Sequence, residues 1–172
     1  MYTKNNKMGH TLDITIRASI LLICLGYIIL AFPGYEPLPE LTAQVNAQVL
    51  STIGIPAISL ERYVVVSFSQ VDRIYELSSE CSGLLVYMMF LIGIAVVPYF
   101  SAHNRLFALL FLPILFLGNS LRILTGIIVG FRFSVDASEF FHATFGQVLI
   151  FFWVLVCFIL WLKLTRNFPK DE

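Results

Sequence analysis

Four long apolar runs place the strongest constraint on how this chain can fold. They cover residues 14–32, 83–100, 106–130 and 140–164. Each is close to or above the roughly 20 residues that a helix needs to cross a hydrocarbon core. Of the 172 residues, 58% are hydrophobic and only 13% are charged, whereas about 25% are charged in a typical soluble domain. The sequence therefore predicts an all-α integral membrane protein with four transmembrane helices in a single membrane domain, residues 1–172.

The distribution of basic residues predicts the orientation of these spans. Lysines and arginines flank one side of the predicted helices: Lys4, Lys7, Arg17, Arg105, Lys163, Arg166 and Lys170. Short loops rich in Lys and Arg stay in the cytoplasm, so we expect a multi-pass protein of the cell membrane with both termini inside. No small-residue cleavage site follows the first run, which favours a retained span over a signal peptide. Residues 34–82 then form an outer segment, which is predominantly acidic.

The outer segment has two differently patterned halves. Between residues 38 and 53, apolar side chains recur at helical spacing, at Leu38, Leu41, Val45, Val49 and Ile53. This pattern predicts an amphipathic helix that lies on the outer leaflet or across the top of the bundle, and Gly54 and Pro56 should end it. Residues 57–77 are rich in β-forming residues with partial alternation at Val64, Val66, Phe68 and Val71. They predict a short β-hairpin.

Of the three cysteines, Cys81 has the surroundings of a reactive thiol. Cys24 and Cys157 lie in the middle of apolar runs, where a cysteine behaves as a small hydrophobic residue. If Ser78 caps the second span, Cys81 occupies its third helical position, where the helix dipole lowers a thiol pKa. Glu80 opposes this effect unless it is turned away or paired. The alternative is an inert cysteine at the membrane interface.

Two polar residues of the later spans would reach the same level as Cys81. Arg122 lies about 24 Å along the third span at 1.5 Å per residue, in the outer half of the membrane, and Asn119 shares its helix face. An arginine inside a span costs about 2.5–3.5 kcal/mol, so it usually faces a polar cavity or a partner. The alternative is a structural arginine bound to backbone carbonyls. The GxxxG sequence at residues 126–130 predicts close helix packing.

His142 completes this group near the start of the fourth span. Asp136 and Glu139 resemble a capping box that opens the helix, which puts His142 at the outer interface. A purely structural histidine is the alternative. A thiolate, a cationic donor for an oxyanion and an imidazole are together the groups needed for acyl transfer through a thioester.

The motifs "ECSGL", "NSLR" and "FHATFG", in this order on successive spans, resemble the archaeosortase/exosortase family of membrane transpeptidases. The resemblance covers about residues 40–163. It implies that Cys81 is the nucleophile, Arg122 stabilises the oxyanion or thiolate, and His142 is the general acid/base. Asn119, Glu80 and Ser82 would support them.

The same resemblance implies the substrates. They would be exported proteins with a C-terminal motif, a membrane span and a basic tail, cleaved at the outer surface. A lipid headgroup is a possible acceptor. No metal cluster or nucleotide-binding motif occurs in the sequence, so we expect no cofactor, no metal and no nucleic acid.

Two other classes of function remain open from the sequence. A membrane scaffold or assembly protein would need none of the three residues to be reactive. A small transporter would use Asn119 and Arg122 to line a pathway. The cytoplasmic halves of the predicted spans are almost purely apolar, which argues against a path through the bundle.

Overall fold

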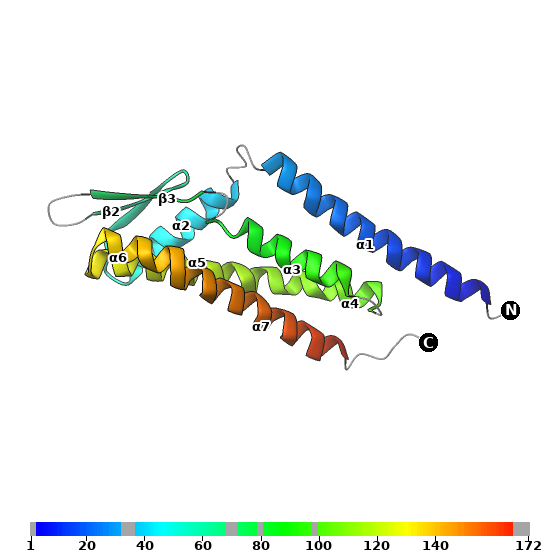
Figure 1. The fold of residues 1–172 in the computed structure, drawn as a ribbon. Coiled ribbons are helices and arrows are strands. Elements are labelled where there is room, and N and C mark those ends of the chain that lie inside the picture. The colour runs from blue at the N-terminus through cyan, green and yellow to red at the C-terminus, as the bar shows by residue number, and fades with distance from the viewer. Residues whose placement is uncertain (1–2, 32–36, 68–71, 79–80, 98–99, 167–172) are drawn as a thin grey trace.

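The computed structural model describes residues 3–31, 37–67, 72–78, 81–97 and 100–166. These form a mostly helical protein with one small sheet. The helical elements are α1 (Thr3–Ala31), α2 (Pro37–Thr52), α3 (Leu84–Val96), α4 (Ala102–Phe107), η1 (Ala108–Phe111), α5 (Leu112–Arg132), α6 (Val135–Phe140), η2 (Phe141–Phe145) and α7 (Gly146–Arg166). Figure 1 shows the sheet, α2 and α6 at one end of the helical bundle, and the start of α1 and the end of α7 at the other.

Two helices in the described part of the chain are long and apolar enough to cross a membrane. One runs over Ala102–Arg132 and the other over Val135–Thr165, each 31 residues long. The first combines α4, η1 and α5. Its 3₁₀ turn ends at Phe111, two residues before Pro113, which lacks a backbone N–H and occupies the first turn of α5. The third and fourth predicted spans are therefore present as continuous helices of suitable length and composition.

The second predicted span is shorter than expected. α3 has 13 residues, or about 20 Å at 1.5 Å per residue, against the predicted residues 83–100. Val97 is already extended, with φ −63° and ψ 119°, because the residue before a proline avoids the helical conformation, and Pro98 follows it. α1 is helical through residue 31 and contains most of the first predicted run, and the two 31-residue helices are the ones that meet the criteria of length and hydropathy among the described residues.

The outer segment forms a three-stranded sheet, so the prediction of a two-stranded hairpin was incomplete. Strands β1 (Ala57–Leu60), β2 (Tyr63–Ser67) and β3 (Asp72–Glu76) pair antiparallel in the order β1-β2-β3. The alternation is confirmed at Val64 and Val66, whose side chains are fully buried. Phe68 and Val71 lie outside the described residues. The third strand was missed because its inward-facing residues, Arg73 and Tyr75, are polar or amphipathic and only half buried. The strand therefore lacks the alternation of apolar and polar residues that would predict it.

The helix predicted before the sheet is present as α2, and the face that packs on the protein is not its apolar row. The face against β1 and α5 consists of Pro39, Thr42, Ala43, Asn46, Ala47 and Leu50. Small side chains let the helix approach the sheet closely. Leu41, Val49 and Ile53 are instead exposed on the other side. Gly54, with φ +85°, ends the helix as predicted, and the Ile55 N–H then donates to the Leu50 carbonyl.

Helix α5 connects the two ends of the core. Ile123, Leu124 and Ile127 pack against α2 and the sheet, whereas Leu115 packs among α3 and α7. The predicted close packing of the GxxxG residues is also found, against α6. The Ser138 hydroxyl donates to the Gly126 carbonyl at 2.8 Å, and a Cβ on Gly130 would lie 3.0 Å from that of Ser138.

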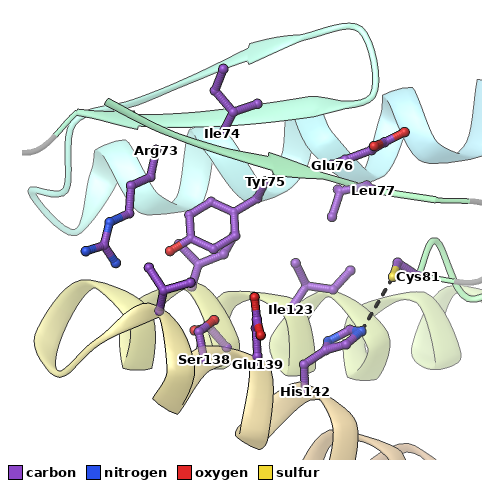
Figure 2. Close-up of a pocket in the computed structure, with 13 residues that line it drawn as sticks. Arg73, Ile74, Tyr75, Glu76, Leu77, Cys81, Ile123, Ser138, Glu139 and His142 are labelled. Carbon is purple, nitrogen blue, oxygen red and sulfur yellow. Dashed lines mark hydrogen bonds between the residues drawn. The ribbon is translucent and has the colours of Figure 1, made fainter. Parts of the chain in front are cut away.

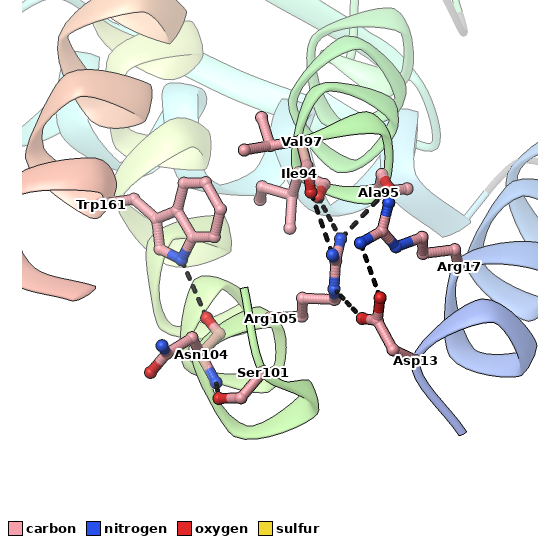
Figure 3. Close-up of polar contacts among 9 residues, drawn as sticks. All are labelled: Asp13, Arg17, Ile94, Ala95, Val97, Ser101, Asn104, Arg105 and Trp161. Atoms are coloured by element: carbon pink, nitrogen blue, oxygen red, sulfur yellow. Dashed lines mark hydrogen bonds and ion pairs between the residues drawn. The ribbon is translucent and has the colours of Figure 1, made fainter. Parts of the chain in front are cut away.

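A buried polar cluster holds the opposite end of the bundle together. Arg105 of α4 donates to the carbonyls of Ile94, Ala95 and Val97 and to Asp13 of α1 (Figure 3). These contacts join α1, α3 and α4. They also satisfy carbonyls at the C-terminal end of α3, a position where carbonyls lack partners within the helix itself.

Candidate active site

Cys81 lies where the sheet passes into the bundle. The Cys81 N–H donates to the Ser78 hydroxyl at 3.3 Å, and the Ser82 N–H donates to the Ser78 carbonyl at 2.9 Å. Ser78 therefore caps a helical turn, as the sequence predicted. However, this turn is not the first turn of α3, because Gly83 adopts φ +91° and α3 begins at Leu84. The prediction that Cys81 occupies the third position of the span was wrong.

Gly83 and Asn119 explain why these residue types occur in the motifs "ECSGL" and "NSLR". A positive φ is accessible to glycine at little cost. A Cβ at Gly83 would lie 3.0 Å from Asn119 Nδ2, so a side chain there would meet Asn119. Asn119 Nδ2 donates to the Cys81 carbonyl at 2.8 Å, and this bond fixes the cysteine backbone against α5.

Arg122 is buried on the same face of α5, as its spacing from Asn119 predicted. Its Nε donates to Asn119 Oδ1 at 3.2 Å and its Nη2 to the Cys81 carbonyl at 3.2 Å. Its Nη1 lies 3.5 Å from His142 Nδ1. One expected alternative, a structural arginine on backbone carbonyls, describes only one of these three contacts. Three of the five N–H groups of a guanidinium are used here.

His142 is placed by an irregular helix rather than by the predicted capping box. The cap of α6 is Ser134, whose hydroxyl accepts from the Ala137 N–H, and Asp136 lies in the first turn. The helix then widens into the π-helical segment η2, which contains His142. Such segments are rare and occur frequently at functional sites. A Cβ on Gly146, the last residue of "FHATFG", would lie 3.5 Å from Arg122 Cγ and Cδ, so this glycine lets the helix pass close to the arginine.

The structure brings Cys81, Arg122 and His142 together from three elements. Cys81 Sγ lies 3.5 Å from His142 Nε2 (Figure 2), and Arg122 contacts the other ring nitrogen. A guanidinium only donates hydrogen bonds, so the Arg122 contact is a hydrogen bond when Nδ1 is unprotonated. The ring then carries its proton on Nε2, facing the sulfur. A donor in this position stabilises the thiolate form of Cys81.

These surroundings lower the pKa of the Cys81 thiol to about 7. The hydrogen bond with His142 is the main cause, and Ser78 and the charges of His142 and Arg122 act in the same direction. Burial raises the pKa and opposes them. The sequence predicted a lowered pKa for this thiol but attributed it to the dipole of the second predicted span, whereas the main cause is His142.

The other predicted residues lie as follows. Ser82 is fully buried beside Cys81, and Glu80 falls outside the described residues. Cys24 and Cys157 are free thiols buried in the apolar core, as expected. Within the described ranges, no group of three or more His, Cys, Asp or Glu side chains could hold a metal ion.

A cavity of about 480 Å³ opens beside the cysteine. Strand β3, α5 and the α6–η2 helix form its walls, and Cys81 and His142 lie at one end (Figure 2). Its size is typical of a ligand pocket. Residues of β3 were not predicted to line a cavity, because their polar and apolar side chains follow no distinctive motif.

The arrangement can therefore generate a thiolate, supply a proton beside it and hold a positive charge behind it, at the edge of a cavity. The model of the transmembrane exosortase family matches residues 8–161, a range that contains the whole cluster. No curated protein and no solved structure matches the chain. The family match extends the resemblance seen in the motifs to include most of α1.

Proposed function

Because the chain belongs to the transmembrane exosortase family, we propose that it is a cysteine transpeptidase that cleaves the C-terminal sorting signal of exported proteins. The family consists of membrane cysteine peptidases and transpeptidases that act on exported proteins. Membership in this family, together with the two long apolar helices, indicates that the chain is a membrane protein. The sorting signal of these substrates consists of a short motif, a membrane span and a basic tail.

The observation that carries this proposal is the contact between the Cys81 sulfur and His142 Nε2, with Arg122 on the other side of the ring. A thiolate is the nucleophilic form of cysteine, and a pKa near 7 populates it at neutral pH. In this proposal Cys81 is the nucleophile, His142 the general acid/base and Arg122 the cation that stabilises negative charge.

The proposed reaction has two halves. The Cys81 thiolate attacks the carbonyl carbon of the scissile peptide bond, and Arg122 stabilises the resulting oxyanion. His142 holds the proton lost by the Cys81 thiol as an imidazolium and passes it from Nε2 to the leaving amine. The peptide bond breaks, the signal peptide departs and the exported protein remains as a thioester. An acceptor then gives a proton to the neutral His142 and attacks the thioester, which expels the Cys81 thiolate. The acceptor is a lipid headgroup or water.

Topology supports a site at the outer membrane interface. We propose four spans in a single membrane domain, α1, α3, α4–α5 and α6–α7, with both termini in the cytoplasm. The sheet and α2 then lie outside, at the end of the bundle opposite the start of α1 (Figure 1). Cys81, which lies between β3 and α3 in the chain, is at the same level. A substrate that is anchored by its own span presents its cleavage motif at this level.

The test compares membrane proteins in cells that carry the wild type or Cys81→Ala. We expect exported proteins with a C-terminal span and basic tail to keep that segment only in Cys81→Ala cells, as detected by mass spectrometry of C-terminal peptides. Cys24→Ala is the matched control, since Cys24 is a buried thiol far from the cluster along the chain. Full processing in Cys81→Ala would instead favour the scaffold function.

Sidedness has its own test. A membrane-impermeant maleimide should label Cys81 from outside intact cells, and Cys24 and Cys157 should remain unlabelled. Labelling of Cys81 only after the cytoplasmic side is exposed would contradict the proposed topology and the reaction with exported proteins.

A further inference from the structure

One wall of the cavity beside Cys81 is the edge of a β-strand. Five consecutive residues line it, Arg73, Ile74, Tyr75, Glu76 and Leu77. Successive side chains of a strand point to opposite faces of the sheet. Figure 2 accordingly shows Ile74 and Tyr75 on opposite sides of β3. A cavity that borders both kinds of residue must border the edge of the strand between the two faces.

The register indicates which backbone groups of β3 face this edge. The Leu77 N–H donates to the Arg62 carbonyl, and pairing continues with Tyr75 opposite Val64. In an antiparallel pair, bonded and non-bonded positions alternate. The backbone groups of Asp72, Ile74 and Glu76 therefore point away from β2. β3 is an edge strand of the sheet, and in the described part of the chain no further strand pairs with these backbone groups.

The opposite wall of the cavity is one face of a helix, and residues from successive turns of this helix line the cavity along its length. Val135, Ser138, Glu139 and His142 line it from α6 into η2, and Ile123, Gly126 and Ile127 of α5 lie between the two walls. The space is thus a trough between a strand edge and a helix. Its two ends differ, because Arg73 lies at one end and the Cys81 sulfur at the other (Figure 2).

We propose that the exported segment of the substrate directly before the scissile bond binds in this trough as a fourth strand, paired with β3. This inference rests on the proposed function. Extended peptides add to exposed sheet edges in this way, with main-chain hydrogen bonds supplying much of the affinity. β3 is five residues long, so four or five residues of substrate can pair before the chain reaches Cys81.

Topology also fixes the direction of the added strand. β3 runs from Asp72 towards Cys81 and the bundle, from outside towards the membrane. The substrate runs in the same sense, since its exported part precedes its own membrane span. The fourth strand is therefore parallel to β3. In a parallel pair both the N–H and the carbonyl of one residue point to the partner, and Ile74 occupies the central such position.

A proline scan with matched controls tests this pairing. Ile74→Pro removes the outward N–H without removing a bond to β2, and proline is tolerated on edge strands. Ile74→Ala removes the same exposed side chain but keeps the N–H. Ser59→Pro makes the equivalent change on β1, the other edge of the sheet, where Ser59 lies opposite Val64. The probe is a substrate protein identified by the comparison of wild-type and Cys81→Ala cells.

We expect Ile74→Pro to process this substrate at least fivefold more slowly than Ile74→Ala, which corresponds to the loss of about one backbone hydrogen bond. Ser59→Pro should process it at the wild-type rate. The pH midpoint of Cys81 alkylation by iodoacetamide, measured in each variant, reports whether the thiol keeps its folded surroundings. Equal rates for Ile74→Pro and Ile74→Ala would overturn the paired strand while leaving the transpeptidase intact. If the wild type removes no C-terminal segment, the proposed function itself fails.

A crosslinking scan gives a second, independent measurement. In an Ile74→Cys, Cys81→Ala double variant, single cysteines are placed at successive positions before the cleavage site of the same substrate. A parallel strand predicts disulfides with the engineered cysteine at alternate substrate positions, because side chains alternate between faces. Disulfides at every position, or with helical spacing, would contradict the proposal.

Discussion

Two buried arginines lie at opposite ends of the bundle, and their surroundings differ in kind. Arg105 is 2% exposed and Arg122 is 4% exposed. Arg105 donates to the Asp13 carboxylate and to three backbone carbonyls (Figure 3). Arg122 contacts the Asn119 amide, the His142 ring and one carbonyl. Among the residues that the structure describes, Asp13 forms an ion pair with Arg105, whereas none of the ion pairs includes Arg122.

The difference indicates what each arginine is for. A buried charge is costly unless it is paired. Arg105 has a carboxylate and three carbonyls as acceptors. Its charge is therefore compensated in the resting protein, and its role is to hold α1, α3 and α4 together. Arg122 has a neutral set of partners beside a thiol that ionises near pH 7. The negative charge that would compensate it is that of the thiolate, and in the proposed reaction that of the oxyanion.

The largest expected effect is on folding, at Arg105. Arg105→Ala leaves Asp13 with only the Arg17 partner and leaves carbonyls of α3 unpaired, so we expect the free energy of unfolding to fall by about 3–5 kcal/mol. Thermal unfolding in detergent measures the loss. Processing per folded molecule should stay near the wild-type rate, because the cluster is remote from Cys81. A strong loss of processing by folded Arg105→Ala protein would abolish the distinction between the two arginines.

Arg17 provides the matched control for that variant. Arg17 also pairs with Asp13, but both side chains in that pair are 25% exposed. Partly exposed ion pairs contribute about 0–1 kcal/mol. Arg17→Ala should therefore unfold within a few degrees of the wild type. A loss as large as that of Arg105→Ala would mean that the charge of Asp13, rather than the carbonyl contacts of Arg105, dominates the cluster.

At Arg122 the expected effect is on the reaction. Arg122→Lys keeps the positive charge but loses the planar fork that contacts Asn119, His142 and the Cys81 carbonyl together. We expect processing to fall about 10²-fold, the usual order for loss of an oxyanion donor, with a much smaller change in thermal unfolding than in Arg105→Ala. Wild-type processing by Arg122→Lys would show that Arg122, like Arg105, only supports the bundle.

The sequence predicted the parts of the molecule whose signal is local. Apolar runs located the two 31-residue helices, and Gly54 and Pro56 marked the end of α2. Cys81, Arg122 and His142 could be identified because each is a polar, reactive residue next to or within an apolar run, at the same predicted depth. Their meeting in space followed from the order of the spans, without any knowledge of side-chain contacts.

The features that were not predicted depend on contacts between residues that are distant in the sequence. Gly83 and Gly146 are required by the close approach of Asn119 and Arg122, which only the packed structure defines. The amphipathic pattern predicted α2 as a helix, but it did not predict that small residues would pack on the sheet while Leu41, Val49 and Ile53 are exposed. The third strand was missed because β3 has mostly polar or exposed side chains and contributes an edge rather than a core face.

A tenfold effect is expected at the thiol itself. The pKa of Cys81 is lowered to about 7 chiefly by His142, so the thiolate predominates above that pH and is lost as the pH falls below it. In His142→Ala the pKa should rise towards the ordinary value of about 8.5. At pH 7, iodoacetamide should then alkylate Cys81 about tenfold more slowly. A pH profile of alkylation measures both midpoints, and an unchanged midpoint would remove His142 as the cause.

The smallest expected effect is at Ser78, and it separates the turn that holds Cys81 from the groups that activate it. The Ser78 hydroxyl accepts a hydrogen bond from the Cys81 N–H and also lowers the pKa of the thiol, but less than His142 does. Ser78→Ala should therefore shift the midpoint of alkylation upwards by less than His142→Ala, and slow alkylation at pH 7 about two- to threefold. Ser78→Thr retains a hydroxyl and should restore the wild-type midpoint. If Ser78→Ala shifts the midpoint as far as His142→Ala, the turn rather than the histidine controls the thiol, and the site would depend on the local backbone more than on the contact between distant helices.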